Sequence, residues 1–221
     1  MPDSNAHLLS KAPFFEGFPA DVMQQLQDAS TLRKYKKNSH IINQGDNSQA
    51  AYLLVEGTAL AYIDDKEGNE FIFNTFKPGD CFGELGLLDD QPRSAHVVTT
   101  SNCDCLVIPK AEFQRCVFTS PDAASATIRM LIARIRAMTD EVSCLAMLDV
   151  YGRIARLIQN SSAEASDGTR ETGRMTHQEI ANRIGSSREM VSKIIKDLTV
   201  GGYISTHKQR ITLVKDLPER W

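Results

Sequence analysis

The chain has 221 residues, of which 42% are hydrophobic and 24% are charged, with a formal net charge of −3. This length provides for one large or two small domains, and the composition is ordinary for a soluble globular protein. No apolar run approaches the roughly 20 residues that span a bilayer, and the N-terminus lacks the features of a signal peptide. We therefore expect a cytoplasmic protein without a membrane partner.

Charge is distributed unevenly along the chain. Residues 1–120 contain 10 basic and 16 acidic side chains, a net charge of −6, whereas residues 174–215 contain 8 basic and 3 acidic side chains, a net charge of +5. A basic C-terminal segment on an acidic body predicts that this end of the protein faces DNA.

The five cysteines are an odd number and form no CxxC motif. In a cytoplasmic chain this pattern predicts reduced thiols rather than disulfides. Cys103 and Cys105 are two residues apart in an expected strand and share a face. They could be a metal-binding pair, but we favour buried small hydrophobic residues and expect no metal.

The first 120 residues predict a small antiparallel β-roll. A short helix is expected over "PADVMQQLQDAS", residues 19–30, and short strand-like runs follow it from residue 39. Glycines at 45, 57, 68 and 79 separate these runs at intervals of 12, 11 and 11 residues. Evenly spaced short strands with glycine turns are typical of a barrel or roll. Two further strands are expected at 95–100 and 103–110.

The hydrophobic period changes in the next segment, 121–148. No Gly or Pro occurs from 122 to 146, and apolar residues recur there at alternating steps of three and four. Such an a/d seam predicts a helix that pairs with a second copy as a coiled coil, hence a homodimer. A helix lying on its own roll is the alternative, although it usually shows a broader apolar stripe. The expected interface residues are Ile128, Leu131, Ile135, Met138, Val142 and Leu145.

The remaining segment, 149–221, predicts a winged helix-turn-helix. It contains a short helix at "YGRIARLIQN", a polar loop at 161–173, two helices separated by Gly185, and a hairpin after Gly201-Gly202. The predicted fold is therefore α+β: a β-roll at 1–120, a dimerisation helix at 121–148 and a winged helix-turn-helix at 149–221.

The order of these parts, with "FGELGLL…RSA", "LDVYGRIA" and "HQEIANRIGSSREMVSKIIKDL", resembles the cyclic-AMP receptor protein/FNR family of bacterial transcription regulators. The resemblance covers nearly the whole chain. It implies a homodimer with an N-terminal cyclic-nucleotide-binding domain and a C-terminal DNA-binding domain, and RNA polymerase as a partner.

In the resembled family, the loop at 82–95 is the phosphate-binding cassette. Gly83 permits close approach of the backbone, and residues 84–88 can form a helical turn whose N–H groups, Leu85 included, face an anion. Arg93 has the planar donor fork that suits phosphate, and Ser94 adds a hydroxyl. An ionised Glu84 only accepts hydrogen bonds, so it suits a sugar hydroxyl, and the family uses it for the ribose 2′-OH. A Glu84–Arg93 ion pair that braces a tight turn is the alternative.

The resemblance leaves the effector open. In the cyclic-AMP receptor, adjacent Thr and Ser residues of the long helix contact adenine, and the aligned residues here are Met138 and Thr139. Met138 offers only a weak sulfur acceptor. Cyclic AMP is the first candidate, and cyclic di-GMP, which some relatives bind, is the competitor.

Two other sensing chemistries of this family have weaker support. FNR-type iron–sulfur sensing uses an N-terminal cysteine cluster, and here no cysteine precedes Cys81. A haem sensor needs an axial ligand; His7, His40 and His96 are available, but isolated histidines in a roll are usually ordinary surface or core residues.

The second helix of the helix-turn-helix carries the expected reading residues. Arg188 can contact guanine O6 and N7, and Glu189 can accept from cytosine N4, as the family does at these positions. Lys193 stands where the cyclic-AMP receptor has a second arginine. Ser192 lies on the same polar face. The candidate phosphate contacts, which position a protein on DNA, are Thr176, Gln178, Ser187 and Lys196.

Both helices begin with a capping-box pattern, Thr176-x-x-Glu179 and Ser186-x-x-Glu189. The second box gives Glu189 an alternative role, because one carboxylate would serve either the helix end or a base. We favour base reading.

The leading hypothesis is a ligand-responsive homodimer that binds a palindromic operator. A regulator of the same family that responds to cyclic di-GMP or needs no ligand is one alternative. A cyclic-nucleotide-binding module that acts on a protein partner is another, and the basic C-terminal segment argues against it. We find no nucleophile–base pair, P-loop or metal-ligand cluster in the sequence, and expect no enzyme activity.

Overall fold

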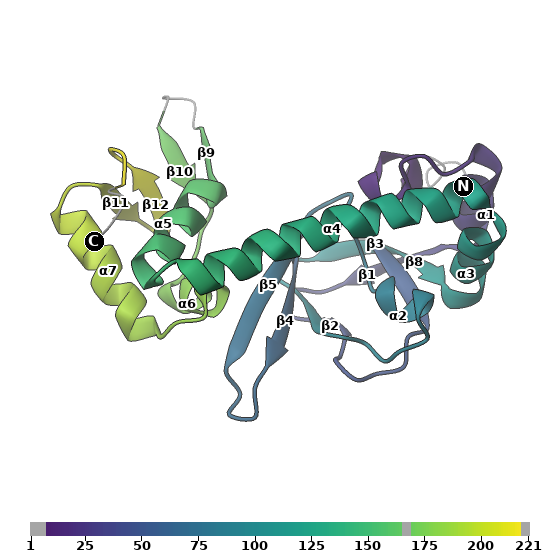
Figure 1. Cartoon of the computed structure of the whole chain (residues 1–221), viewed down its shortest axis with the longest axis horizontal. Coiled ribbons are helices and arrows are strands. Elements are labelled where there is room, and N and C mark those ends of the chain that lie inside the picture. The colour runs from purple at the N-terminus through teal and green to yellow at the C-terminus, as the bar shows by residue number, and fades with distance from the viewer. Residues whose placement is uncertain (1–7, 165–168, 218–221) are drawn as a thin grey trace. The chain divides into compact units, whose positions relative to one another are not determined.

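The computed structural model describes residues 8–164 and 169–217 (Figure 1). His7 therefore lies outside the described residues. So do the start of the expected first domain, at 1–7, and the end of the expected last domain, at 218–221. The chain forms two compact units, which we describe separately. Unit 1 comprises residues 1–63 and 72–136, and unit 2 comprises residues 64–71 and 137–221.

The β-roll expected from the glycine spacing is confirmed. It consists of two four-stranded sheets, with antiparallel pairings between neighbours. One sheet has the order β1 (Thr31–Tyr35), β8 (Cys103–Pro109), β3 (Ala50–Glu56), β6 (Cys81–Phe82). The other has the order β2 (His40–Ile42), β7 (His96–Thr99), β4 (Ala59–Asp64), β5 (Glu70–Phe76).

Short helical segments pack against the sheet that contains β3 and β8. They are the 3₁₀ turns Leu9–Lys11 and Pro13–Phe15, with α1 (Ala20–Ala29) and α3 (Lys110–Thr119). Their apolar faces share one core with β3 and β8, in which Leu26, Leu106 and Phe113 are fully buried. Pro19 precedes the first residue of α1, as the sequence predicts.

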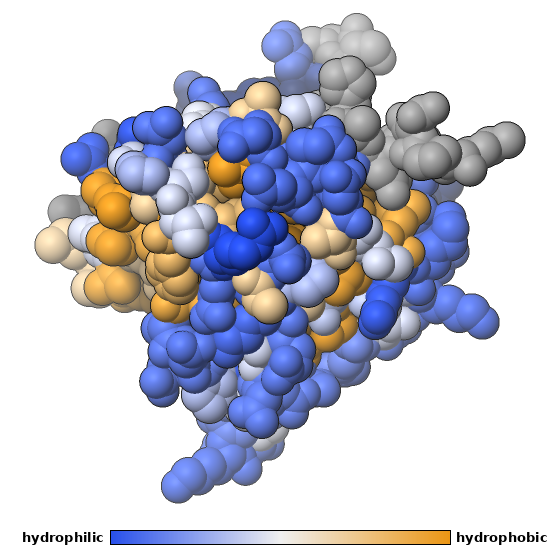
Figure 2. All heavy atoms as spheres, turned by 90° about the vertical axis from the view of Figure 1, so that its right-hand side faces the viewer, coloured by the Kyte–Doolittle hydropathy of each residue, from blue (hydrophilic) through white to orange (hydrophobic). Residues whose placement is uncertain are grey.

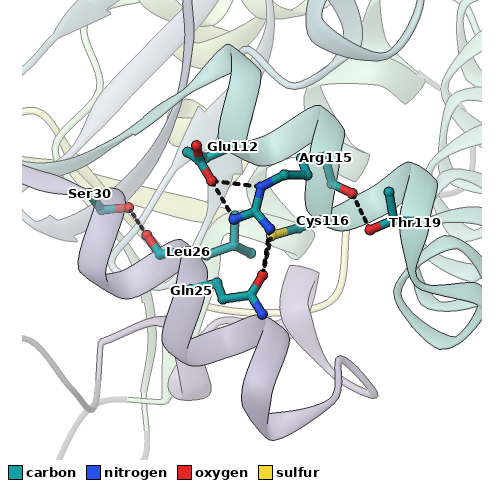
Figure 3. A network of polar contacts seen from close by, with 7 residues as sticks. All are labelled: Gln25, Leu26, Ser30, Glu112, Arg115, Cys116 and Thr119. Atoms are coloured by element: carbon teal, nitrogen blue, oxygen red, sulfur yellow. Dashed lines mark hydrogen bonds and ion pairs between the residues drawn. The ribbon is translucent and has the colours of Figure 1, made fainter.

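A polar network joins α1 to α3 (Figure 3). The Arg115 side chain lies between the two helices: its Nη2 is 2.5 Å from Glu112 Oε2, and its Nη1 donates to Gln25 Oε1 at 2.9 Å. Exposed ion pairs of this kind contribute at most about 1 kcal/mol. The buried apolar core, rather than this network, holds the two helices on the roll.

The long helix α4 spans Pro121–Met147, in agreement with the predicted helix. Ala123, Ala126 and Thr127 are at most 3% exposed, and the two alanines belong to the core of unit 1. The predicted seam does not pack there: Ile128, Ile135 and Val142 are 56, 62 and 64% exposed. The seam is thus an unburied apolar stripe within the described chain.

Apolar side chains also reach the surface elsewhere. On the face shown in Figure 2 they lie in several groups between hydrophilic side chains. Single exposed apolar residues are normal in soluble proteins. The heptad spacing of the α4 stripe, rather than its exposure alone, is therefore the feature that points to an interface.

Unit 2 has the predicted winged helix-turn-helix. Its elements are α5 (Val150–Ser161), β9 (Ser162–Glu164), β10 (Arg170–Thr172), α6 (His177–Ile184), α7 (Arg188–Val200), β11 (Ile204–His207) and β12 (Arg210–Leu213). The loop predicted at 161–173 is partly wrong, because β9 and β10 pair with each other and β10 also pairs with β12. These pairings are tertiary, and the polar local sequence gives no sign of them.

All five cysteines are free thiols, and four of them are buried. Cys105 is fully buried in β8, and burial raises the pKa of its thiol to about 12. Among the described residues, no group of three or more His, Cys, Asp or Glu side chains is arranged to bind a metal ion. Within the same residues, no helix combines the length and apolar character needed to cross a bilayer.

Candidate functional site

The cassette begins at a glycine that the local packing requires. Gly83 has φ +77°, and a Cβ there would stand 2.7 Å from Arg93 Nη1 and 2.9 Å from Ile42 Cδ1. A larger residue would therefore be strained and would also displace the guanidinium. The sequence predicts that another group lies close to the backbone at Gly83. In the structure this group is the guanidinium of Arg93, from the same loop.

Arg93 is held by backbone carbonyls. It is 7% exposed, its Nη1 donates to Gly83 O, and its Nη2 donates to Ala50 O at 2.6 Å. The guanidinium also lies 6.0 Å from the centre of the Tyr52 ring. Burial lowers the pKa of Arg93, with nearby Tyr52 and Glu84 opposing the shift. The side chain thus ties the cassette to β3, and a guanidinium has more N–H groups than these two bonds use.

Glu84 is buried, with 1% of its side chain exposed, and it pairs with Arg134 of α4. The Glu84–Arg93 ion pair considered from the sequence is not formed. Burial raises the pKa of Glu84, while the charges of Arg134 and Arg93 act in the opposite direction. The sequence analysis did not predict a role for Arg134. This residue lies 50 positions from Glu84, on a helix for which mainly the apolar residues were considered.

The helical turn predicted at 84–88 is present as α2 (Leu85–Leu88). Leu85 is 36% exposed and Ser94 is exposed, so both are accessible beside the buried Glu84. Gly86 is a second glycine that packing requires, because a Cβ there would stand 2.0 Å from Ser48 Oγ. Sequence reasoning assigned Gly86 no role.

A larger cleft lies elsewhere in unit 1; none of residues 82–95 lines it, but Arg134, the partner of Glu84, does. It has a volume of about 740 Å³ and is lined by the Pro13–Gly17 segment, residues 79–81 and one face of α4, including Arg129 and Arg134. Gly83, Arg93 and Ser94 do not line it. The cleft and the cassette are therefore distinct spaces, with Arg134 between them.

The residues aligned with the adenine contacts lie on α4 in unit 2. Met138 is 56% exposed, and Thr139 is also exposed. Of the other interface candidates, Leu145 is 38% exposed and Leu131 is half-buried. Ile132, which sequence reasoning did not select, is 46% exposed and widens the stripe.

The first helix of the helix-turn-helix has the predicted capping box. Glu179 N donates to Thr176 Oγ1 at 3.1 Å, and Thr176 N donates to Glu179 Oε2 at 2.6 Å. The helix ends at Gly185, which has a left-handed backbone. Gln178 donates to Asn182 at 2.7 Å along the exposed side of α6.

The predicted start of the second helix is wrong by one residue. The N-cap of α7 is Ser187, whose Oγ accepts from Met190 N at 3.2 Å. Ser186 and Ser187 are equally good caps by type, and only the geometry of the turn selects between them. Glu189 consequently forms no capping box, and its carboxylate makes no hydrogen bond with a described residue.

Helix α7 has one buried face and one exposed face. Val191, Ile194, Ile195 and Leu198 are at most 7% exposed and join the core of unit 2. The exposed face carries Arg188, Glu189, Lys193 and Lys196. Met190, at 44% exposed, lies among them and was missed.

Ser192 has an internal partner that the sequence did not indicate. Its Oγ lies 2.8 Å from His177 Nδ1, which links the first residue of α6 to α7. A cavity of about 500 Å³ adjoins this pair, lined by Thr176, Gln178, Arg188 and the β11–β12 turn from Thr206 to Ile211. The turn supplies His207, Lys208 and Arg210, basic residues that sequence reasoning did not assign to the DNA interface.

Two of the three histidines weighed as haem ligands, His40 and His96, lie in an aromatic cluster on the second sheet of the roll. The His96 ring stacks on Tyr62 with centroids 4.9 Å apart, and His40 lies 6.3 Å from His96. The His40 ring meets the rings of both His96 and Tyr62 edge-on.

A roll with a phosphate-type cassette, a long helix and a winged helix-turn-helix together define a class of protein, the nucleotide-sensing DNA-binding regulators. Residues 32–120 match the cyclic nucleotide-binding domain, and residues 152–219 match the Crp-like helix-turn-helix domain. The chain belongs to the cyclic-AMP receptor protein/FNR family of transcription regulators.

The relatives agree with this placement. The cAMP-activated global transcriptional regulator CRP of Salmonella typhimurium is 33% identical over 186 residues, covering 82% of this chain and 89% of that protein. The cAMP-activated regulator Vfr of Pseudomonas aeruginosa is 32% identical, covering 78% and 84%. Among solved structures, the c-di-GMP-responsive global regulator CLP of Xanthomonas campestris has a TM-score of 0.78 at 26% identity, covering 89% of this chain and all of that chain.

Proposed function

We propose that this family member works as a homodimer that binds a cyclic nucleotide at the cassette and a palindromic operator through α7. The observation that carries the proposal is the arrangement around Gly83, where one loop holds two buried charged side chains, Glu84 and Arg93. Buried charges are costly unless they are paired or serve a ligand. A cyclic nucleotide offers both a phosphate for the arginine and a ribose hydroxyl for the glutamate.

We assign the nucleotide to the cassette rather than to the larger cleft. Arg93 retains N–H donors, and Ser94 adds an accessible hydroxyl beside it. The cleft contains neither residue. A ribose hydroxyl that reaches Glu84 would compete with Arg134 for the same carboxylate, so we propose that ligand binding changes the contact between the cassette and α4.

Two effectors remain candidates. The relatives named cAMP-activated favour cyclic AMP, and the structural similarity to CLP favours testing cyclic di-GMP beside it. Calorimetric titration of the full-length protein with cyclic AMP, cyclic GMP and cyclic di-GMP separates them. If Met138 removes an adenine contact, the substitution Met138→Thr strengthens cyclic AMP binding. If the wild-type protein binds cyclic AMP as tightly as the Met138→Thr variant does, adenine is held in another way.

The exposed stripe of α4 supports the homodimer. A substitution of Ile135→Asp would place like charges opposite each other in an apolar seam. We expect light scattering to give a monomer that has lost specific operator binding. A dimer with full operator affinity would place the interface elsewhere.

A symmetric dimer should bind two half-sites about one helical turn apart. The family suggests half-sites like TGTGA, and RNA polymerase as the partner at the promoter. A gel shift on such a palindrome, with and without each nucleotide, tests DNA binding and its dependence on the ligand. Failure to bind any palindrome under either condition would favour the alternative of a module that acts on a protein partner.

A further inference from the structure

A small cavity in unit 2 lies between the faces of three helices. Its volume is about 140 Å³, room for roughly four to five water molecules at about 30 Å³ each. The α5 residues that line it are spaced by three and four positions, so they form one face of that helix. The polar and thiol side chains around it are Glu141 and Cys144 of α4, Arg153, Arg156 and Asn160 of α5, and Arg183 of α6.

The lining of this cavity is strongly cationic. It contains three arginines and a single acidic residue, the exposed Glu141. The arginines are half-buried, and burial lowers the pKa of Arg183, opposed by the charge of Glu179. Like charges held together away from water repel each other unless an anion lies between them.

Arg153 adds an unsatisfied donor to this arrangement. Its Nε is buried and has no hydrogen-bond partner among the described residues. Its Nη1 lies near Gly185, the residue that ends α6: a Cβ added to this glycine would be 3.8 Å from it. A buried donor without a partner is costly, and in native proteins it usually marks a bound water or ion.

We propose that this interhelical cavity binds a compact oxyanion of the size and charge of inorganic phosphate. Guanidinium groups match the oxygens of phosphate or sulfate geometrically, and Asn160 adds an amide donor at the rim. The volume accommodates such an ion and excludes a whole nucleotide. A bound oxyanion joins the last turns of α4 to α5 and α6, and so stabilises the junction that precedes the reading helices.

Hydrogen exchange of the full-length protein, followed by mass spectrometry during phosphate titration at constant ionic strength, tests this site. We expect saturable protection in peptides from the end of α4, from α5 and from α6. Sulfate should protect the same peptides. Cyclic AMP is too large for the cavity, so it should not compete with phosphate for this protection. Absence of phosphate-dependent protection there, or protection confined to residues 82–95, would overturn the proposal.

Substitutions of single arginines test which side chains bind phosphate. Arg153→Gln should weaken phosphate binding about tenfold or more, as expected for loss of a charged hydrogen bond. Arg156→Gln provides a second test if Arg153→Gln does not fold, and the exposed Arg174→Gln in the same unit is the matched control. Equal phosphate affinity in all three variants would refute the assignment.

Glu141 provides the opposite test. Its negative charge in the lining repels a bound oxyanion, so Glu141→Gln should raise the affinity for phosphate several-fold. An unchanged or lower affinity would overturn the electrostatic argument for the cavity.

Discussion

The cassette and the reading face of α7 both carry charged side chains, but they hold them in different states. In the cassette, Glu84 and Arg93 are 1% and 7% exposed and already have partners within unit 1. On α7, Arg188, Glu189 and Lys193 are exposed and form no hydrogen bond with described residues. Under the proposed function, a nucleotide that reaches Glu84 would have to displace Arg134, whereas DNA would meet α7 side chains that have no partner among the described residues to displace.

This difference predicts which substitutions damage the fold and which damage only binding. Removing a partner inside the cassette leaves a buried charge, so the effect appears in stability. Removing a side chain from the reading face leaves only solvent behind, so the effect appears in DNA affinity.

The largest effect is expected for Arg134→Ala, which leaves Glu84 buried without its cation. We expect a loss of about 3 kcal/mol in the free energy of unfolding, measured by urea denaturation. The exposed Arg136→Ala on the same helix is the control and should change little. Equal stability of the two variants would mean that the Glu84–Arg134 contact is not formed in solution.

The pH dependence of Arg134→Ala sharpens this test. Burial raises the pKa of Glu84 above its ordinary value of 4.5, so the folded protein binds this proton more tightly than the unfolded chain. The stability that a protonated Glu84 contributes is present below the unfolded pKa and is lost as pH rises through the folded pKa. Because the variant lacks the opposing cation, its deficit relative to wild type should be larger at neutral pH than near the unfolded pKa.

Arg93→Ala should affect both binding and stability. Loss of a charged hydrogen bond should weaken nucleotide binding by about 1.5–3 kcal/mol in calorimetry. The loss of its bonds to Gly83 O and Ala50 O should also lower the melting temperature. The exposed Ser94→Ala is the matched comparison and should weaken binding less, with an unchanged melting temperature. Wild-type nucleotide affinity in Arg93→Ala would refute the phosphate assignment.

Arg188→Ala should show the reverse pattern, with an unchanged melting temperature. We expect a loss of about 1–3 kcal/mol in operator affinity and relaxed discrimination at a single guanine. Binding to a panel of single-base operator variants measures both. A uniform loss across the panel would exclude Arg188 from base reading.

Ser187 and Glu189 should separate helix capping from base reading. Ser187→Ala removes the observed cap and should reduce stability by about 1 kcal/mol. Glu189→Ala should leave stability unchanged and remove the preference at one base pair. A lower melting temperature for Glu189→Ala, with the base preference retained, would restore the capping role to Glu189.

The smallest effect is expected for Lys196→Ala. If this side chain contacts phosphate, its loss should weaken binding to all operator variants alike and reduce the salt dependence by about one unit. Operator binding at two salt concentrations measures this change. A sequence-dependent loss would indicate a base contact instead.

The sequence predicted the elements that have a strong period of their own. The steps of three and four in α4, the buried stripe of α7 and the regular glycines of the roll are local signals. Strand β1 was missed because "TLRKY" is polar and mostly exposed, and its pairing with β8 is a tertiary contact. The β9–β10 ribbon was missed for the same reason.

The site was predicted less completely than the fold. The motif placed Gly83, Glu84 and Arg93 in one loop but could not identify their partners, because Arg134 and Ala50 lie far away in sequence. The cap of α7 was misplaced because two adjacent serines satisfy the same rule. His177 was missed because its bond to Ser192 depends on how α6 and α7 cross.

The Arg134–Glu84 contact also bears on how quickly a ligand can arrive. A pocket whose acceptor is already occupied cannot capture every nucleotide that reaches it, because the carboxylate must first release its cation. For the nucleotide proposed here, association should therefore be slower than for an open pocket and should reach a limiting rate at high ligand concentration. Dissociation, in turn, should be hastened by the return of Arg134, so the regulator would follow changes in the concentration of its effector closely.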